Sequence, residues 1–407
     1  MLGKFFKSKK RVKSTIAIAS GGTGGHIFPA LVVAEDLIKN GYEVLFLTDK
    51  RFHNFSKYFN DIIQSKNFTL LVLDAEQSGR SFLGKIGLIF RTIKITYQCF
   101  NLLKIYRIGL SIGFGSYASF PVILASFLRK IPSLIHEQNA FIGFSNRLAS
   151  FFAKKIMTSF ADTHGFYRFT LRKAVFVGMP IRKEIAELYY ENQNHNINYP
   201  SFYRTSQKIN ILILGGSQGS AILTKVFLET AAMLDKSIRD RLFVYHQCRS
   251  EDVSSVVGKY NDMGVKSHVQ SFFPDAGRLM TMSHLCISRS GAGSICDLAA
   301  SGAPTIFVPL RSAKDNHQLL NARCVYEGGG CILIEERDFN ANKLSLVISS
   351  IIESPKELFD LSLGIKKFAK LDSSEKICNI INDVIKAEKN FIKNGTKSVK
   401  TNDVGIG

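Results

Sequence analysis

The stretch TIAIASGGTGGHIFPA, residues 15–30, decides the fold. It opens with a run of apolar and small residues, Thr15–Ala19, which favours a buried β-strand. The glycine-rich segment Gly21–Gly25 then predicts a tight turn at the end of that strand. We expect a helix from about Pro29, because proline fits the first turn of a helix, and Asn40-Gly41 to end it. Together these elements predict the opening unit of a doubly wound α/β domain.

A second stretch of the same kind, NILILGGSQGS, residues 210–220, opens the other half of the chain. After both openings, short apolar runs alternate with helical patterns, which is typical of parallel sheets covered by helices. Besides the two opening strands, we expect strands at 43–47, 69–73, 110–113, 133–136, 174–177, 242–245, 284–288, 304–308 and 331–334. The predicted fold class is α/β, with two Rossmann-like doubly wound parallel-sheet domains and a cleft between them.

The length of 407 residues is enough for two or three domains. A polar, asparagine-rich segment, 191–200, separates the two α/β halves and indicates a linker. We divide the chain into a first domain at 14–180, a linker at 181–208, a second domain at 209–370, a C-terminal helix at 371–390 that returns to the first domain, and a flexible tail at 391–407.

The charge balance indicates an anionic partner, since 53 Lys and Arg face 33 Asp and Glu, a net charge of +20. The seven cysteines are odd in number and form no CxxC, which argues against a disulfide framework or a structural zinc site. No apolar run reaches the roughly 18 residues of a membrane-spanning helix, and the N-terminal run is too short for a signal peptide. We therefore expect the protein to stay on the cytoplasmic side of the membrane.

The glycine turns are candidate phosphate sites. A strand that ends in glycines and opens a helix presents free backbone N–H groups, and the helix dipole adds partial positive charge there. No Gly-Lys-Ser/Thr follows either turn, so a P-loop is excluded. A third turn reads Gly113-x-Gly115-x-x-Ala118, with Glu137 at the end of the next strand. That pattern leaves a dinucleotide-binding site open as an alternative to a nucleotide-sugar enzyme.

Seven segments, taken in order, resemble the motifs of the MurG family of N-acetylglucosaminyltransferases. They are ASGGTGGHIFPA at 19–30, GFGSYASFP at 113–121, HEQN at 136–139, GMPIR at 178–182, GGSQG at 215–219, SRSGAG at 288–293 and KDNHQ at 314–318. The resemblance implies a GT-B fold and an inverting transferase that moves N-acetylglucosamine from UDP-N-acetylglucosamine to the undecaprenyl-pyrophosphoryl-muramyl-pentapeptide of peptidoglycan synthesis. It implies no metal and no other cofactor.

The resemblance also assigns candidate site residues. For the donor UDP-N-acetylglucosamine these are Thr23, Gly24, Gly25, Asn139, Arg182, Ser217, Phe273, Ala292, Gly293, Ser294, Asp297 and Gln318. For the acceptor they are Gly113, Gly115, Ser116, Tyr117 and Glu137. Two departures from the family pattern stand out. Position 297 is Asp where the family usually has Glu, so contact with the ribose would be longer or through water, and the second loop reads Gly-Phe-Gly.

The reaction needs a base for the acceptor hydroxyl and positive charge for the departing diphosphate. His26 is the candidate base, since it sits at the mouth of the first glycine turn and titrates near neutral pH. The alternative is that His26 only hydrogen-bonds the loop or the acceptor, with Glu137 as base. Arg182 and Arg289 are candidate partners of the diphosphate. Asp49 and Asp74 form no Asp-x-Asp metal pair, and we expect them to cap turns or face solvent.

An enzyme with a lipid-linked acceptor must act at the surface of a bilayer. The residues Phe82, Ile86, Ile89, Ile93, Tyr97 and Phe100 form one helical stripe, flanked by Lys85, Arg91 and Lys94. The basic N-terminus adds further cations. Together they predict peripheral binding to an anionic membrane, at the cytoplasmic face of the bacterial inner membrane. The alternatives are a core face for the stripe and a merely solvated N-terminus.

Other functions stay open on the sequence alone. Another GT-B enzyme of UDP-sugars, such as a glycolipid glycosyltransferase or a UDP-N-acetylglucosamine epimerase, would share the glycine turns, and so would an inactive membrane scaffold. No RNA- or DNA-binding module is recognisable and the charge is spread through the chain, so we expect no nucleic-acid partner. The resemblance leaves other wall-synthesis proteins open as partners.

Overall fold

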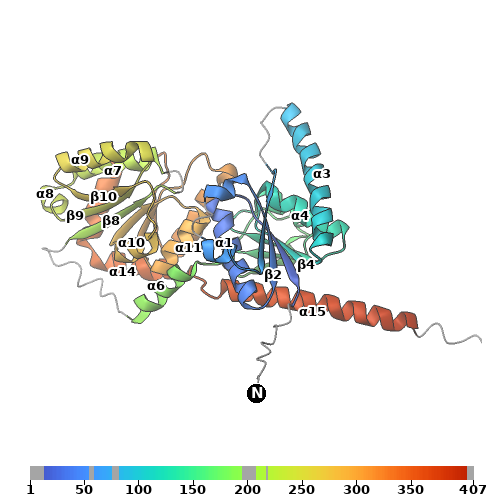
Figure 1. Ribbon diagram of the computed structural model, residues 1–407. Coiled ribbons are helices and arrows are strands. Elements are labelled where there is room, and N and C mark those ends of the chain that lie inside the picture. The colour runs from blue at the N-terminus through green and yellow to red at the C-terminus, as the bar shows by residue number, and fades with distance from the viewer. Residues whose placement is uncertain (1–12, 55–58, 76–81, 195–207, 217–218, 401–407) are drawn as a thin grey trace, which may run out of the picture.

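The computed structural model describes residues 13–54, 59–75, 82–194, 208–216 and 219–400. Two α/β lobes lie side by side, and a long C-terminal helix runs along the first of them (Figure 1). Each lobe is built on one parallel sheet with helices packed against it. Two Rossmann-like doubly wound domains are therefore confirmed.

The first sheet has seven parallel strands in the order β3-β2-β1-β4-β5-β6-β7. Its strands are β1 (Thr15–Ala19), β2 (Glu43–Asp49), β3 (Phe68–Leu73), β4 (Ile108–Gly113), β5 (Ser133–Glu137), β6 (Lys155–Thr158) and β7 (Ala174–Phe176). The central strand β1 pairs with β2 on one side and β4 on the other, so that its register sets Ala19 beside both Leu47 and Gly113. Because all strands run the same way, their carboxyl ends share one edge of the sheet.

The second sheet has six parallel strands in the order β10-β9-β8-β11-β12-β13. Its strands are β8 (Ile209–Leu214), β9 (Leu242–Gln247), β10 (Lys266–Gln270), β11 (Leu285–Ser288), β12 (Thr305–Phe307) and β13 (Ile332–Leu333). The strand order reverses beside the first strand of each sheet, and that is where ligands bind in doubly wound folds.

The helices connect these strands. They are α1 (Gly24–Lys39), α2 (Asn60–Ile63), α3 (Phe82–Ile105), α4 (Ser116–Leu128), α5 (Phe144–Ala149), α6 (Lys183–Asn194), α7 (Ala221–Met233), α8 (Lys236–Arg239), α9 (Val253–Asp262), α10 (Ala276–Met282), α11 (Ala292–Ser301), α12 (His317–Glu327), α13 (Ala341–Glu353), α14 (Pro355–Lys366) and α15 (Ser373–Lys400). Single 3₁₀ turns are η1 (Lys50–Asn54), η3 (Leu171–Lys173), η5 (Ser250–Asp252) and η6 (Lys314–Asn316).

The expected start of the first helix is wrong. Helix α1 begins at Gly24, with Thr23 as its N-cap, so Pro29 lies in the second helical turn rather than the first. The N–H groups of His26 and Ile27 both donate to the Thr23 carbonyl and close the first turn. The glycine turn is therefore shorter than expected, and its last two glycines already belong to the helix.

Two strands were not expected, β6 and β10. Strand β6 has only four residues, and β10 (KSHVQ) is polar because it forms an outer edge of the second sheet and is only partly buried. Neither has the long apolar run that marks a central parallel strand. Both extend the sheets outward without changing their centres.

Helix α15 joins the core of the first domain. Its buried residues Ile377, Cys378, Ile381 and Ile385 share one hydrophobic cluster with β1, β2 and α1. The Ser374 hydroxyl also donates to Asp36 of α1 at 2.6 Å. This helix continues to Lys400, so the expected flexible tail is helical over 391–400.

The segment expected to be a linker, 181–208, contains helix α6. This helix packs against α10 and α11 of the second domain. The part of the segment at 195–207 lies outside the described residues. Across the chain's described parts, no helix combines the length and apolar character needed to cross a bilayer.

Candidate active site

The two domains meet at elements that follow the carboxyl ends of their strands. The guanidinium of Arg182 lies 5.1 Å above the ring of Phe28 on α1 and 3.3 Å from the carboxylate of Asp297 on α11. Burial raises the pKa of Asp297 above its ordinary value, although the Arg182 charge opposes this. The candidate donor residues Arg182 and Asp297 are thus brought together at the interdomain boundary.

Asn321 on α12 is a second link between the domains. Its side chain is buried, its Oδ1 accepts from the Ala140 N–H at 2.7 Å, and its Nδ2 donates to the Asn139 side chain at 3.1 Å. The same Nδ2 lies 3.2 Å from the Ser290 carbonyl of the second domain. Asn139, a candidate donor residue, is therefore held by an asparagine that lies outside the seven motif segments.

The first glycine turn is fixed by Asp49 at the end of β2. One oxygen of its buried carboxylate accepts from the Gly22 N–H at 2.9 Å, and both oxygens accept from the Arg51 side chain at 2.7 and 2.9 Å. Burial acts to raise the pKa of Asp49, but the bonds from Arg51 and Gly22 together hold it below its ordinary value. Asp49 also accepts from the Arg51 backbone N–H at 3.0 Å, so it caps turns as expected but is buried rather than facing solvent. Asp74 faces solvent, 3.4 Å from Lys50.

The start of α1 is open to a ligand. The backbone N–H groups of Gly24 and Gly25 donate to no residue that the structure describes, and the Thr23 hydroxyl makes no capping bond. A helix N-terminus with free N–H groups is an anion site. This geometry suits the phosphate role that the resemblance assigns to these three residues.

His26 lies in the first turn of α1, half-buried. Its Nδ1 is 2.9 Å from the amide oxygen of Gln138, and its Nε2 has no hydrogen-bond partner among the described residues. Burial lowers the pKa of His26 below its ordinary value, opposed by the Glu137 charge and the Gln138 bond. The imidazole is therefore neutral near pH 7, and its Nε2 is open to a ligand.

The third glycine turn, at Gly113–Ala118, packs directly on this histidine. Gly115 has a φ of +84°, and a β-carbon there would lie 3.3 Å from Cε1 of His26 and 3.5 Å from the amide oxygen of Gln138. Ser116 follows as the first residue of α4, and Gly113 ends β4. Gly115 allows the close approach of the two turns, as a side chain would not.

Glu137 is buried and holds its own loop. Its carboxylate accepts from the backbone of Asn139 and Gly143, both at 3.0 Å, and from the side chains of Asn139 and Asn146 at 3.2 and 2.8 Å. All of these donors belong to the loop after β5 or to α5. The geometry therefore speaks against Glu137 as a base, as a direct acceptor ligand and as the ribose-binding acid of a dinucleotide site.

Asn146 on α5 was not expected at the site. Besides its bond to Glu137, its Nδ2 donates to the His136 carbonyl at 3.0 Å, while its buried Oδ1 has no partner in the described part of the chain. The Nδ2 would lie 3.4 Å from a β-carbon at Gly115. The signal that could have found it is the run of polar residues after β5.

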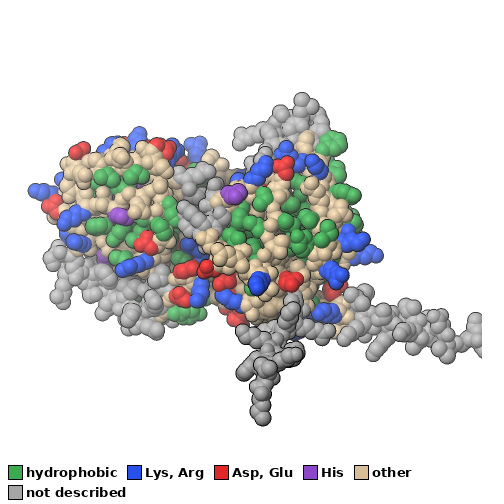
Figure 2. All heavy atoms as spheres, in the orientation of Figure 1, with side chains coloured by type: hydrophobic (Ala, Val, Ile, Leu, Met, Phe, Trp, Pro, Cys, Tyr) green, Lys and Arg blue, Asp and Glu red, His purple; other side chains and the backbone are tan. Residues whose placement is uncertain are grey.

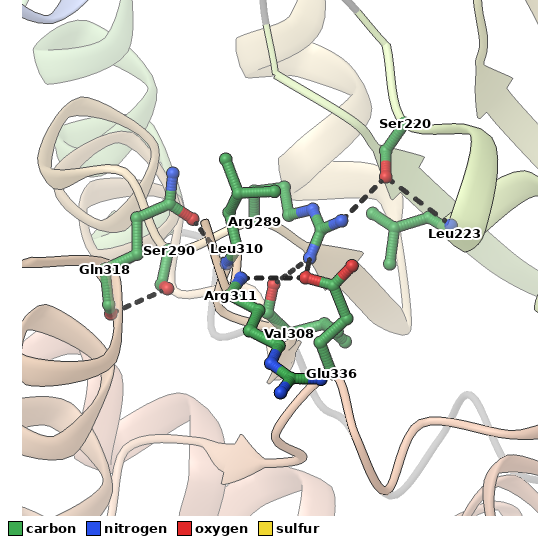
Figure 3. A network of polar contacts seen from close by, with 9 residues as sticks. All are labelled: Ser220, Leu223, Arg289, Ser290, Val308, Leu310, Arg311, Gln318 and Glu336. Atoms are coloured by element: carbon green, nitrogen blue, oxygen red, sulfur yellow. Dashed lines mark hydrogen bonds and ion pairs between the residues drawn. The ribbon is translucent and has the colours of Figure 1, made fainter. Parts of the chain in front are cut away.

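On the donor side, the buried Arg289 organises the second domain (Figure 3). Its guanidinium donates to the Ser220 hydroxyl at 3.0 Å, the Val308 carbonyl at 3.0 Å and the Glu336 carboxylate at 3.2 Å. The Ser220 hydroxyl in turn caps α7 by accepting from the Leu223 N–H. Arg289 was a candidate partner of the diphosphate. Its side chain instead points into the second domain, whereas Arg182 lies at the boundary between the domains.

The remaining donor candidates lie around α11 and α12. The N–H groups of the first α11 residues, Ala292–Ser294, donate to no described residue. The Gln318 amide oxygen accepts from the Leu310 N–H at 3.0 Å, which fixes the amide next to the α11 turn. Phe273 is buried against the ring of His268, 5.7 Å between centroids.

Two candidates gain no further support. Ser217 lies outside the described residues. Tyr117 is half-buried on α4, one residue past the turn that packs on His26. Among the residues that the structure covers, no three His, Cys, Asp or Glu side chains gather as metal ligands would.

Comparisons with known proteins identify the family of both domains. Two family descriptions match, one to each domain: the glycosyltransferase family 28 N-terminal domain over residues 16–158, and the glycosyltransferase family 28 C-terminal domain over residues 210–377. Together they span the three glycine turns and nearly all strands of both sheets; β7 lies between the two matches.

The relatives have one activity in their names. A UDP-N-acetylglucosamine–N-acetylmuramyl-(pentapeptide) pyrophosphoryl-undecaprenol N-acetylglucosamine transferase of Paramagnetospirillum magneticum is 32% identical, covering 92% of this chain and 98% of that protein. The protein of the same name from Zymomonas mobilis is 32% identical, covering 90% and 92%. Among solved structures, Acinetobacter baumannii MurG matches with a TM-score of 0.72 at 24% identity, covering 91% of this chain and 99% of that one. The GT-B fold is thereby shown.

Proposed function

This chain belongs to glycosyltransferase family 28, and we propose that it transfers N-acetylglucosamine from UDP-N-acetylglucosamine to the muramyl sugar of undecaprenyl-pyrophosphoryl-MurNAc-pentapeptide. The relatives that carry this activity in their names cover nearly the whole chain, and both domains contribute to the site. The observation that carries the proposal is the position of His26 between the first and third glycine turns, with no partner at Nε2 among the described residues. Another UDP-sugar enzyme of the same fold is less well supported, because the chain's named relatives are transferases to this acceptor.

The chemistry assigned to the site is an inverting displacement. The 4-hydroxyl oxygen of the muramyl sugar attacks the anomeric carbon of the donor, a new C–O bond forms, and the bond to the UDP phosphate breaks. The hydroxyl proton passes to Nε2 of His26, and UDP leaves with the electron pair of the broken bond. A positioned base contributes about 10²- to 10⁴-fold to the rate of such a step.

The departing diphosphate is stabilised by fixed dipoles. The N-termini of α1, α7 and α11 carry partial positive charge, and the free N–H groups at Gly24, Gly25 and Ala292–Ser294 can donate to phosphate oxygens. Such groups need no reorganisation when charge develops. Arg182 adds a full positive charge at the boundary between the domains.

The Arg182–Asp297 ion pair engages one oxygen of the carboxylate that we assign to the ribose hydroxyls. A bound donor must therefore share that carboxylate with Arg182 or displace it. Asn139 and Gln318 contact the sugar in this proposal. Glu137 acts through the loop it holds, whereas Gly113, Gly115, Ser116 and Tyr117 form the acceptor side.

Transfer to a short-chain analogue of the lipid-linked acceptor tests the proposal. We expect wild-type protein with labelled UDP-N-acetylglucosamine to form the disaccharide, with chelator present. His26→Ala is expected to lose about 10²- to 10⁴-fold in turnover and to bind UDP as wild type does, because the uridine contacts lie in the other domain. Donor binding without any transfer by wild type would refute the acceptor assignment, and unchanged turnover in His26→Ala would refute the base.

We also propose that the protein binds an anionic membrane through α3. Ile89, Ile93 and Tyr97 are 61%, 60% and 68% exposed, and Phe90 beside them is 69% exposed. The buried face of α3 is instead formed by Ile95, Thr96, Cys99 and Leu103. The core-face alternative is therefore wrong for these three stripe residues, while Phe100 is half-buried and the side chains of Phe82 and Ile86 lie outside the described ones.

The position of this surface fits a membrane role. Helix α3 stands at the outer edge of the first domain, and green hydrophobic side chains line that edge in the space-filling view (Figure 2). Lys94 is exposed beside the apolar residues. Exposed apolar groups with cations beside them suit the headgroup region of an acidic bilayer. The basic N-terminus lies outside the described residues.

Vesicle flotation tests the membrane proposal. Wild-type protein should float with vesicles that contain anionic lipid, and Ile93→Glu should reduce the bound fraction several-fold. Leu346→Glu on α13 is the matched control, since Leu346 is 73% exposed but lies in the second domain. Equal loss of binding in both variants, or binding that ignores anionic lipid, would overturn this assignment.

A further inference from the structure

Four side-chain and backbone groups form one hydrogen-bonded chain that ends at His26. The Gly178 carbonyl lies 3.0 Å from Nε2 of His136, and Nδ1 of His136 lies 3.1 Å from Nε2 of Gln138. The Gln138 amide oxygen then lies 2.9 Å from Nδ1 of His26. The chain is anchored on a second side as well, because Nε2 of Gln138 also donates to the His136 carbonyl at 3.1 Å.

The donor and the acceptor of every bond in this chain follow from the Gly178 carbonyl, which can only accept. A carbonyl oxygen only accepts, so the His136 nitrogen facing Gly178 must carry the hydrogen. The other nitrogen of neutral His136 is then an acceptor and takes a hydrogen from the Gln138 amide nitrogen. The Gln138 oxygen must therefore face His26, and since it too only accepts, the hydrogen of His26 must sit on Nδ1.

These bond directions hold when both histidines are neutral. His136 is buried, and burial lowers its pKa to about 4. Burial also lowers the pKa of His26. The charged and titratable groups that act on His26 come from three directions: Glu137 raises its pKa, whereas Arg51 and His317 lower it. At neutral pH the balance leaves the imidazole uncharged.

We propose that His136 and Gln138 are positioning residues that hold His26 in the tautomer with the hydrogen on Nδ1 and a free lone pair on Nε2. This inference rests on the proposed function, in which Nε2 takes the acceptor proton. The base is thus oriented by a backbone carbonyl of the GMPIR segment, two side chains away. Gly115 supports the arrangement, because it packs on both His26 and Gln138 without a side chain.

The chain predicts a ranked set of effects on turnover. Gln138→Met removes the acceptor for the Nδ1 hydrogen, so both tautomers become populated, and kcat should fall by about 10- to 100-fold, within the contribution of a positioned base. The KM for UDP-N-acetylglucosamine should stay within about 2-fold of wild type, because the donor contacts are untouched. His136→Phe should cost less, since Gln138 keeps its bond to the backbone carbonyl of residue 136.

The variant Gln138→Glu distinguishes a role in orienting His26 from a role in stabilising the fold alone. A carboxylate at this position still accepts the Nδ1 hydrogen, but its charge favours the protonated imidazole. The pKa of His26 should rise, and the acid limb of the pH profile of kcat/KM should move upward by about 1 to 3 pH units. Gln64→Glu, on an exposed position of the same domain, adds the same charge and should leave the limb in place.

The decisive measurement is the tautomer itself. Two-bond ¹H–¹⁵N spectra of histidine-labelled protein, with His26 assigned by its loss in His26→Gln, show which ring nitrogen carries the hydrogen. We expect the Nδ1–H form in wild type and a mixture in Gln138→Met. If Gln138→Met does not fold, the nearly isosteric Gln138→Glu gives the pH readout instead.

Each outcome separates this inference from the proposed function. An Nε2–H tautomer in wild type, or a Gln138→Glu profile that matches wild type while His26→Ala is inactive, would overturn the positioning role and leave the base intact. Normal turnover in His26→Ala would overturn the proposed base, and the inference with it, even if the spectra showed the expected tautomer.

Discussion

Replacing Arg289 by Met should lower the free energy of unfolding of the second domain. It should not act by removing a direct contact with the donor. The side chain is 8% exposed and donates to Ser220, Val308 and Glu336. Breaking a buried ion pair costs about 3 to 5 kcal/mol. Glu336 is 19% exposed and keeps its 2.8 Å bond from the Arg311 N–H, so water and this bond partly compensate it. The lower limit, about 3 kcal/mol, is therefore expected.

The assay is urea and thermal unfolding of the variant and wild type. For a domain of this size, a loss of about 3 kcal/mol lowers the melting temperature by about 6 to 12 °C. Arg311→Met is the matched control, since the Arg311 side chain is exposed and only its backbone enters the network. In a double-mutant cycle with Glu336→Leu, the two losses should overlap by about 1 to 3 kcal/mol.

The result that would refute this reasoning is an unchanged stability together with a raised KM for UDP-N-acetylglucosamine. That outcome would mean that Arg289 faces the diphosphate, as the sequence suggested. A stability loss with no coupling to Glu336 would show that the ion pair carries none of it, and that the bonds to Ser220 and Val308 do.

Two further predictions concern the turns around His26. Gly115→Ala places a β-carbon at a positive φ and 3.3 Å from His26, and should lower kcat by about 10- to 100-fold in the transfer assay; normal kcat would mean that the turns can separate freely. Asp49→Asn should lower stability at pH 7 by about 1 to 2 kcal/mol in urea unfolding. Because the folded-state pKa of Asp49 is depressed, its contribution is present above its ordinary value of 3.8 and is lost as pH falls through the lower folded value, so the two proteins should converge in acid; a constant gap from pH 7 to acid would contradict the assignment.

The fold could be predicted because its signals are local. A central parallel strand is buried on both faces and reads as a continuous apolar run, as in β1 and β8. The edge strand β10 lacks that constraint, and its polar sequence looks like a loop. The start of α1 was misplaced for a related reason, since Gly24 and Gly25 look like turn residues, although their lack of side chains lets the helix end approach a ligand.

The site could be predicted only in part, because its supports depend on contacts distant in sequence. Gln138 stood inside a recognised motif, but its role appears only when β5 brings it against His26 of another element. Asn321 lies three residues after Gln318 on one face of α12, a spacing that could have indicated it. Asp49 was expected to cap a turn, as it does at Arg51, but nothing local showed that Gly22 of the first glycine turn would also engage its carboxylate.

The same contacts explain why Nε2 of His26 stays available among the described titratable groups around this turn. At the carboxyl edge of its sheet, the acceptor atoms of Asp49, Glu137 and His136 are occupied by donors from their own surroundings. These bonds also fix the loops around the site. The groups that stabilise the site are therefore ones whose acceptor atoms are already hydrogen-bonded and cannot readily take a proton. Nε2 of His26 lacks a partner among the described residues, and its orientation is set by Gln138 before any substrate binds. A base held in advance in this way loses little free energy to reorganisation when the acceptor arrives, which is the condition for efficient proton transfer.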